Sequence, residues 1–481
     1  MNDGLVLRRV EVEGRPVDVH LADGLVAAVG PGLAVPSGTP ELHGRGGALL
    51  PGLHDHHVHL LAMAARTAGL DLDPLPDASA VDRLLTNTSR EVVARATTSR
   101  DVSGGGDWVR ASGYDEHRHG PMDRYRLDAL VGAVAIRVQH RSGLGWVLST
   151  EGLRSAGLLG VEGSPPMWPD GVEVGGDGRL TGWLHRLDDW LGDRVPPARG
   201  DLAAVSRSLS GYGITGVTDA THALGLVRLA ILRIARQVGE LQQRLVLLGT
   251  GDDEAVQGWA RIGPAKGLAD EMLGLDPLAM TDWIRVVHAH GRPVAIHAVT
   301  RAENVAAVTA LIEAGPLAGD RLEHGSVLPV DLDPLLVAGG VTVIVQPSLV
   351  YERGDHHLGQ VEAEDLPFLH RHASLLAAGV RVGVGSDAPV TSADPWAGIV
   401  AASTRRTRTG GLVGSGEAVD PATALGWYLA DPLDPGGPPR RVVVGAAADL
   451  CLLDGTMADA LAEPTAERVR HTWVAGRLVY P

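Results

Sequence analysis

The 481-residue sequence predicts an α/β protein: a (β/α)8 TIM barrel with a small β-sandwich domain built from both chain termini and an inserted cap subdomain. Three observations predict this class. Short apolar segments alternate with helical stretches through the middle of the chain, which is typical of a parallel sheet. Both ends of the chain are rich in strand-like sequence. One long stretch interrupts the strand–helix alternation, which indicates an insertion.

The two chain ends have similar, strand-like sequences. Residues 5–32 contain "LVLRRVEVEG", "RPVDVHLADG" and "LVAAVGPG", which alternate apolar and polar positions between glycine turns. Residues 440–481 contain "RRVVVGAAADLCLLDG" and "VRHTWVAGRLVYP". We expect residues 1–50 and 436–481 to form one β-sandwich domain. Two unrelated tails are the alternative.

Eight segments of the middle region are the predicted strands of the barrel, and helical stretches separate most of them. The segments are 47–59, 213–220, 244–250, 261–270, 292–298, 320–325, 341–347 and 381–389. The predicted barrel therefore comprises residues 51–67 and 206–435. Roughly 140 residues separate the first two strands, which is too long for an ordinary loop. We expect residues 68–205 to form a cap subdomain over the barrel mouth, where it would set substrate specificity.

The composition excludes several classes of protein. A formal net charge of −16 would repel nucleic acids and anionic membranes, so we expect neither as a partner. Cys451 is the single cysteine, which excludes a disulfide framework and a cysteine metal cluster. The opening "MNDGLVLRRVEVEG" lacks the apolar core of a signal peptide, and no window resembles a membrane span. We expect a cytoplasmic protein with a small-molecule substrate, and a homodimer as its candidate assembly.

Potential metal ligands recur where the predicted barrel strands end. His57 and His59 lie two residues apart, so on a strand both side chains point the same way, as a chelating pair must. The carboxyl ends of all barrel strands meet at one face, where active sites form. Each residue alone could be an ordinary hydrogen-bonded side chain, but their coincidence at strand ends indicates a metal site. The candidate ligands are His57, His59, Lys266, His297, His324 and Asp387.

Lys266, in "GPAKGLADEM", is the only lysine among the 42 Lys and Arg residues. A lysine amine can lose its proton and take up CO2 to form a carbamate, and burial or nearby cations favour this by lowering its pKa. Arginine stays charged and cannot react in this way. The two carbamate oxygens could bridge two metal ions about 3.5–4 Å apart. We expect Lys266 to be carboxylated. The alternative is that this lysine has been retained by chance in an arginine-rich composition.

The sequence as a whole resembles the amidohydrolase superfamily, and within it amidohydrolase family 3, the YtcJ-like group that includes N-substituted formamide deformylases. The matching motifs occur in order along nearly the whole chain and include "PGLHDHHVHL", "GITGVTDA", "GPAKGLADEM", "VAIHAVT", "RLEHGSV" and "GVGSDAPV". The resemblance implies a role for every ligand. The first metal ion would be bound by His57 and His59, carboxylated Lys266 would bridge, His297 and His324 would bind the second ion, and Asp387 would be both ligand and acid/base catalyst.

The sequence also departs from the family pattern. His54 and His56 stand where the family commonly has an apolar residue and a serine. Leu144 and Leu148 replace a histidine and an asparagine expected after "HRSG", and Arg186 replaces a glutamate expected after "TGWLH". The metal ligands keep the pattern while the substrate-facing residues differ. No relative's substrate can therefore be transferred to this protein.

Imidazole and carboxylate ligands suit zinc, so we expect two divalent metal ions, Zn2+ in particular. Such ions activate a water molecule and polarise the substrate oxygen, and Asp387 would deliver the proton to the leaving group. We expect hydrolysis of a C–N bond in an amide, an N-acyl or N-formyl amine, or a cyclic amide. Two alternatives stay open: a non-hydrolytic isomerase, dehydratase or decarboxylase on the same metals, and a catalytically inactive metal-binding module.

Four further residues are predicted substrate contacts. Tyr114 and Asp115 in "GYDE" and His140 in "QHRSG" belong to the predicted cap, and ordinary capping and turn stabilisation are their alternative roles. Gln346 ends the seventh predicted strand beside the ligands, so its assignment rests on the barrel register.

Overall fold

The computed structural model describes residues 4–98, 108–159, 168–196 and 200–481. The chain forms two compact units. Unit 1 comprises Met1–Leu60 and Leu202–Pro481, and unit 2 comprises Leu61–Asp201. Unit 2 is thus inserted into the sequence of unit 1. It contains residues 68–201 of the predicted cap, and the last four residues of that prediction, 202–205, belong to unit 1.

Unit 1 contains two sheets in which every pairing is parallel. The first consists of β6 (Leu53–Val58), β13 (Ile214–Asp219), β14 (Arg244–Leu247) and β15 (Arg261–Ile262), in the order β15-β14-β13-β6. The second consists, in spatial order, of β16 (Ala265–Leu268), β17 (Val294–Ala298), β18 (Arg321–His324), β19 (Thr342–Val345) and β20 (Arg381–Val384). A parallel bridge between Val58 and Ala388 links the two sheets. The carboxyl ends of the strands in each sheet therefore lie on the same side.

Two of the predicted strands are interrupted. The first forms two strands, β5 (Leu49–Pro51) and β6, on either side of Gly52. A Cβ on Gly52 would lie 2.1 Å from Thr215 Cγ2, so only glycine allows the backbones to approach here. The fourth forms β15 and β16 on either side of a segment that contains Pro264, whose nitrogen cannot donate to a ladder. Accordingly β15 pairs with β14, whereas β16 pairs with β17.

Helices separate most strands of the two parallel sheets of unit 1. The α-helices are α7 (Leu202–Gly211), α8 (Leu226–Gln237), α9 (Asp253–Val256), α10 (Pro277–Ala289), α11 (Arg301–Ala314), α12 (Asp333–Gly339), α13 (Ser348–Gln360), α14 (Ala373–Ala377), α15 (Pro395–Thr404), α16 (Pro421–Leu429) and α17 (Met457–Ala462). Short 3-10 helices occur at η1 (Glu271–Leu273), η2 (Val330–Leu332), η3 (Leu366–Phe368), η4 (Ser415–Glu417) and η5 (Ala466–Arg468). Thr300 and Glu303 form a capping box that starts α11. Within the part of the chain that the structure describes, no helix is long and apolar enough to cross a membrane.

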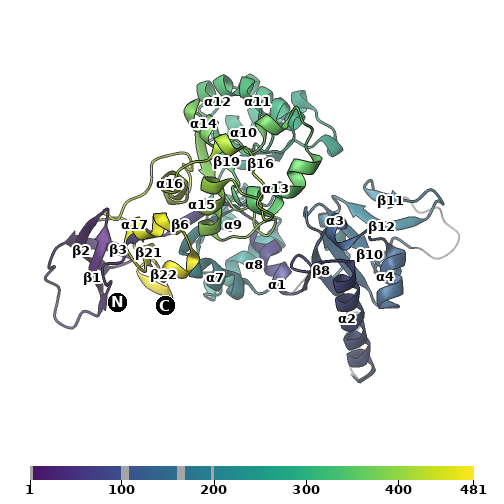
Figure 1. Ribbon diagram of the computed structural model, residues 1–481, viewed down its shortest axis with the longest axis horizontal. Helices are drawn as coiled ribbons and strands as arrows, with labels where there is room; N and C mark the ends of the chain where they lie inside the picture. The colour runs from purple at the N-terminus through teal and green to yellow at the C-terminus, as the bar shows by residue number, and fades with distance from the viewer. Residues whose placement is uncertain (1–3, 99–107, 160–167, 197–199) are drawn as a thin grey trace. The chain divides into compact units, whose positions relative to one another are not determined.

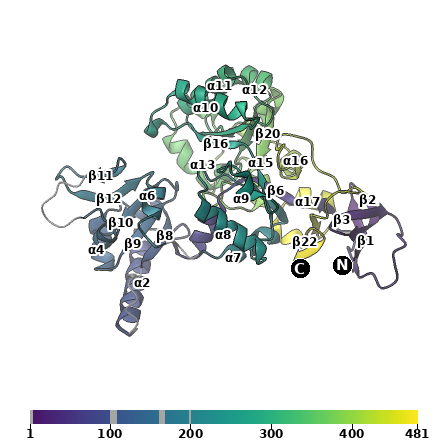
Figure 2. The same cartoon turned by 180° about the vertical axis from the view of Figure 1, so that it is seen from behind.

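Strands from both chain ends share one hydrophobic core. One sheet contains β1 (Leu5–Val12), β2 (Arg15–Ala22), β3 (Leu25–Gly30) and β4 (Glu41–His43), and the other contains β5, β21 (Leu450–Leu453), β22 (Val469–Val474) and β23 (Arg477–Tyr480). Strand β5 pairs with β21. Leu7, Val19, Leu450 and Trp473 belong to the common core. Figures 1 and 2 show these purple and yellow strands side by side from opposite directions.

Unit 2 is built around a six-stranded mixed sheet of its own. Its strands are β7 (Leu70–Asp71), β8 (Val109–Tyr114), β9 (Ile136–His140), β10 (Gly145–Leu148), β11 (Val172–Val174) and β12 (Leu180–His185), in the order β11-β12-β10-β9-β8-β7. Its helices are α1 (Leu60–Thr67), which begins at the last residue of the preceding unit, α2 (Ala78–Thr98), α3 (Glu116–His119), α4 (Arg124–Val131), α5 (Thr150–Ser155) and α6 (Asp188–Gly192). Leu72, Leu127 and Val138 are fully buried in its core, so this unit has a hydrophobic centre separate from that of the terminal strands.

Candidate functional site

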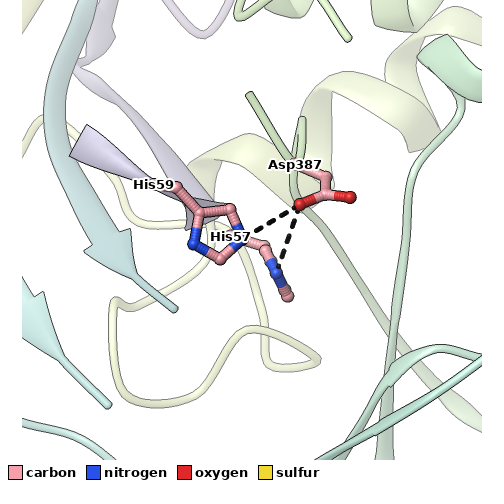
Figure 3. A group of neighbouring side chains, drawn as sticks. All are labelled: His57, His59 and Asp387. Atoms are coloured by element: carbon pink, nitrogen blue, oxygen red, sulfur yellow. Dashed lines mark ion pairs between the residues drawn. The ribbon is translucent and has the colours of Figure 1, made fainter. Parts of the chain in front are cut away.

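Three side chains from two strand ends converge in unit 1 (Figure 3). His57 belongs to β6, His59 follows that strand directly, and Asp387 follows β20. One ligand atom from each lies within 4.8 Å of the others. Asp387 Oδ1 is 3.2 Å from His59 Nε2 and 3.6 Å from His57 Nε2. Two imidazoles and one carboxylate at this spacing have the chemistry of a divalent metal site.

Unusual backbone positions bring these groups together. His324 and Asp387 have positive φ angles of 75° and 59°, which side-chain-bearing residues seldom adopt. Successive side chains of a strand point to opposite faces, but the turn at His324 places both this residue and Glu323 beside His57. Gly385 lies so close to His57 that a Cβ on the glycine would be 2.3 Å from the histidine Cβ. Such constrained positions are typical of functional sites.

The other predicted ligands adjoin this group. The ring centroid of His324 lies 4.8 Å from that of His57 and 4.5 Å from that of His297. Lys266, in β16, is buried, and its Nζ has no hydrogen-bond partner within the described residues. The same is true of His324 Nε2 among those residues. An unpaired buried polar atom costs free energy, so these two atoms fit a site that takes up a metal ion.

Three of the histidines share one arrangement: Nδ1 makes a hydrogen bond to a neighbouring side chain. The pairs are His57 with the Glu323 carboxylate, His324 with Gln346 Oε1 at 3.0 Å, and His59 with Thr221 Oγ1 at 3.3 Å. A carboxylate or an amide oxygen can only accept, so His57 and His324 donate from Nδ1 and leave Nε2 to bind a metal. The Thr221 hydroxyl can donate or accept, so it orients the His59 ring without selecting its tautomer. The geometry therefore gives the predicted substrate contact Gln346 a role in orienting His324.

Burial keeps His57, His297 and His324 in the neutral form that binds metal ions. Burial and the Lys266 amine lower the pKa of His57 to about 3. Burial and the neighbouring His324 ring hold the pKa of His297 well below its ordinary value. Burial also lowers the pKa of His324, although Asp387 acts in the opposite direction. Metal ions thus need not compete with protons for these rings near neutral pH.

The lysine and the carboxylate of the group are shifted in ways that suit a metal centre. Burial lowers the pKa of Lys266 against the opposing effect of Glu323, which favours the neutral amine. Burial alone would raise the pKa of Asp387, but the His59 hydrogen bond and the nearby His324 and His57 rings outweigh it and lower that pKa. The site therefore holds an ionised carboxylate beside a poorly solvated amine.

Arg321 and Glu323, both on β18, are members of the site that the sequence reasoning missed. Their exposed fractions are 1% and 0%. Arg321 Nε and Nη2 donate to the two Glu323 oxygens at 2.5 and 3.1 Å, and Nη2 also donates to the His56 carbonyl at 2.7 Å. Burial alone would raise the pKa of Glu323, but Arg321 and His57 hold it well below its ordinary value. Two opposite charges at alternate positions of the predicted strand "DRLEHG" were the available signal, because buried charges are almost always paired.

His54 and His56, which depart from the family pattern, are buried residues of β6. The His54 Nε2 lies 2.9 Å from Thr218 Oγ1, and the two histidine ring centroids are 4.6 Å apart. Burial holds the pKa of each ring well below its ordinary value. Neither ring belongs to the cluster formed by His57, His59 and Asp387, so both lie in the interior, on the same strand as the candidate ligand His57.

The predicted substrate contacts of the cap have partners within unit 2. Tyr114 Oη donates to the Gly120 carbonyl at 2.7 Å. Asp115 caps α3 and forms an ion pair with Arg141. His140 Nε2 lies 2.7 Å from a carboxylate oxygen of Glu116. These bonds give all three residues roles in stabilising unit 2, and their contact with a substrate stays a prediction.

Comparison with known protein families decides the assignment of the chain. Residues 44–480 match the model of the amidohydrolase family. The chain belongs to the amidohydrolase family. The matched range includes all six predicted metal ligands of this amidohydrolase, from His57 to Asp387.

Other proteins resemble this amidohydrolase along most of its length. The Bacillus subtilis (strain 168) protein YtcJ is 23% identical over 457 residues, which cover 84% of this chain and 83% of YtcJ. An uncharacterized metal-dependent hydrolase from Pyrococcus horikoshii has a TM-score of 0.72 at 17% identity, covering 94% of this chain and 97% of its own. A mutant atrazine chlorohydrolase from Arthrobacter aurescens, complexed with zinc and atraton, has a TM-score of 0.54 at 16% identity, covering 99% and 95%. These likenesses show an α/β fold of the TIM-barrel type.

Proposed function

We propose that this amidohydrolase is a metal-dependent hydrolase that cleaves a C–N bond of a small molecule. The bond would belong to an amide, an N-acyl or N-formyl amine, or a cyclic amide. The observation that supports this most directly is the convergence of His57, His59 and Asp387 beside a buried lysine whose Nζ has no hydrogen-bond partner within the described residues. Membership of the amidohydrolase family supports the same class of reaction.

The residues present fit two divalent metal ions, and imidazole and carboxylate donors suit Zn2+. A zinc-containing structure of the same fold supports this choice. The proposed ligands are His57, His59, Lys266, His297, His324 and Asp387. When bound, such ions lower the pKa of a water molecule toward neutrality and polarise the substrate oxygen.

Lys266 would join this set as a carbamate. Its neutral amine adds to the carbon of CO2 and loses one proton, which yields an anionic group with two oxygens. Burial of the amine and the nearby Arg321 guanidinium both lower its pKa and favour the reactive form, while Glu323 opposes them. The unpaired Nζ points to a modified side chain, because the carbamate would supply the bonds that the bare amine lacks.

Asp387 would move the proton in this reaction. Its carboxylate is ionised, and its Oδ1 lies 3.2 Å from His59 Nε2. A carboxylate held in this position can accept the proton of the attacking water and transfer it to the leaving nitrogen. One residue would therefore act first as base and then as acid.

The finer architecture follows from the same proposal. The two parallel sheets of unit 1, joined by the Val58–Ala388 bridge, would close as one (β/α)8 barrel. The terminal strands, which share one core, would form a β-sandwich. Unit 2 would act as the specificity subdomain, with Tyr114, Asp115 and His140 as substrate contacts.

The test combines metal analysis with isotope labelling. Protein purified without chelator should contain roughly two divalent ions per chain. A screen of N-acyl and N-formyl amines in ¹⁸O-labelled water should yield a carboxylic product that contains the label. A stoichiometry of one or fewer under metal-replete conditions contradicts the two-ion centre. A product without the label contradicts hydrolysis and favours an isomerase or a related enzyme.

A further inference from the structure

The three histidine Nδ1 atoms of the site have chemically different partners. His57 donates to a carboxylate, whereas His59 and His324 face a hydroxyl and an amide oxygen. A hydrogen bond to an ionised acceptor is roughly twice as strong as one between neutral groups. The His57 ring is therefore the most firmly oriented of the three.

The partner of His57 is itself immobilised. Arg321 contacts both oxygens of Glu323, at 2.5 and 3.1 Å, and the same guanidinium bonds to the His56 carbonyl at 2.7 Å. This network ties the carboxylate of β18 to the backbone of β6 one residue before His57. An ionised carboxylate can only accept hydrogen bonds, so Nδ1 of His57 must be the donor and Nε2 carries the lone pair.

We propose that Glu323, clamped by Arg321, is a positioning residue that makes the group of His57, His59 and Asp387 the tighter of two metal sites and the first to fill. The inference rests on the proposed function, in which two ions share the centre.

The second candidate metal site is less well preorganised than the first. It consists of His297 and His324, and the Nδ1 partner of His324 is the neutral amide of Gln346. The first group has three ligand atoms already within 4.8 Å of one another. A carboxylate on the far side of a ligating imidazole also increases the basicity of the ring, and loss of such a partner typically weakens metal affinity about 10–100-fold. Preorganisation and ligand basicity both favour the first group.

The test is a metal titration of the full-length protein after removal of bound metal by a chelator. Zn2+ is added in the presence of a competing chromogenic chelator, and the affinities of the first and second equivalents are measured separately. Wild type should show two unequal affinities. Glu323→Gln should weaken the first equivalent by about 10–100-fold and change the second by less than about threefold. Equal weakening of both, or an unchanged first affinity, would overturn the inference.

Two further variants separate positioning from folding. Arg321→Met combined with Glu323→Gln removes both buried charges together, so it carries the test if the single variant does not fold; it should show the same selective loss. Asp320→Asn is the matched control, because it alters a buried carboxylate next to a different histidine, His288. Its metal affinities should equal those of wild type. If wild type binds Zn2+ with two equal affinities, the inference fails while the proposed function stands; if it binds none, both fail.

Discussion

At each end of β18 a buried carboxylate pairs with a histidine from another element. The two pairs differ in whether the second ring nitrogen of the histidine faces another candidate metal ligand. At the amino end, Asp320 accepts bonds from the backbone N–H groups of Val294 and Leu317, both at 2.8 Å, and lies 3.0 Å from His288 Nε2. The other nitrogen of His288 is 3.0 Å from the Gly315 carbonyl. Every ring nitrogen of this pair faces a protein acceptor.

At the carboxyl end, Glu323 contacts one nitrogen of His57, Nδ1, while the other nitrogen, Nε2, lies 3.6 Å from Asp387 Oδ1. The two pairs therefore differ in the second ring nitrogen, which faces a backbone carbonyl in His288 and the Asp387 carboxylate in His57. A carboxylate–histidine pair whose atoms are all used stabilises the fold, and a pair that keeps one nitrogen toward other ligands can bind a metal ion. This agrees with the general division of such folds into a stabilising amino-terminal face and a reactive carboxyl-terminal face.

The largest effect is expected when a permanent positive charge is placed near the carboxyl end of β18. Lys266→Arg should abolish activity and metal binding, because a permanent guanidinium would repel the metal ions by several kcal/mol at separations of a few ångströms. Metal content and turnover measure the effect. Lys266→Ala should also lose both, but added acetate should partly restore them by substituting for the carbamate. A Lys266→Arg protein that stays active refutes the carbamate.

Asp387→Asn separates proton transfer from metal binding at the same end. The amide keeps an oxygen ligand but cannot accept the proton, so turnover should fall by about 10²–10⁴-fold. Elemental analysis should find much of the metal still bound. Near-normal turnover would show that another residue is the acid/base catalyst.

The amino end should respond in stability rather than in metal affinity. Asp320→Asn places an amide nitrogen opposite one of the backbone N–H groups of Val294 and Leu317, which leaves a buried donor unpaired. The expected loss is about 1–3 kcal/mol of unfolding free energy, measured by urea denaturation of the metal-free protein. Unchanged stability with weakened metal binding would reverse the roles assigned to the two ends.

The smallest effect should come from a neutral partner at the carboxyl end. Thr221→Val removes the hydroxyl 3.3 Å from His59 Nδ1. A neutral hydrogen bond contributes about 0.5–1.5 kcal/mol net, so Zn2+ affinity should fall by about 2- to 13-fold. A loss as large as that of Glu323→Gln would mean that the charge of the partner is irrelevant.

The sequence predicted the parts of the site that depend on regular strand geometry. His57 and His59 two residues apart on one strand had to point the same way, and they lie together with Asp387. The parallel pairing of the strands that contain Lys266, His297 and His324 is also found. For His57 and His59 the residue spacing predicts the common direction of the side chains, and for Lys266, His297 and His324 it predicts which strands contain them.

Irregular backbone and tertiary pairing were not predictable in this way. Strand alternation would put Glu323 and His324 on opposite faces, and only the positive φ of His324 brings both beside His57. The bond between Gln346 and His324 Nδ1 was not predicted from the register, and the contact of Gln346 with a substrate stays a prediction. The division of the first strand at Gly52 depends on how closely Thr215 approaches. These features arise from contacts between distant segments, which a local pattern does not encode.

The carboxyl ends of β6 and β20, which meet at this site, are far apart in the sequence and are therefore synthesised at different times. The amide of Ser386 donates to Asp55 at 2.9 Å across 331 positions of the chain. At a synthesis rate of about 5–20 residues per second, the segment that contains His57 leaves the ribosome on the order of 15–65 s before Asp387 does. Throughout that interval the histidine pair exists without its carboxylate. The complete three-residue group can therefore form only after Asp387 has been synthesised, so a metal ion that needs all three ligands would bind late in synthesis or after it.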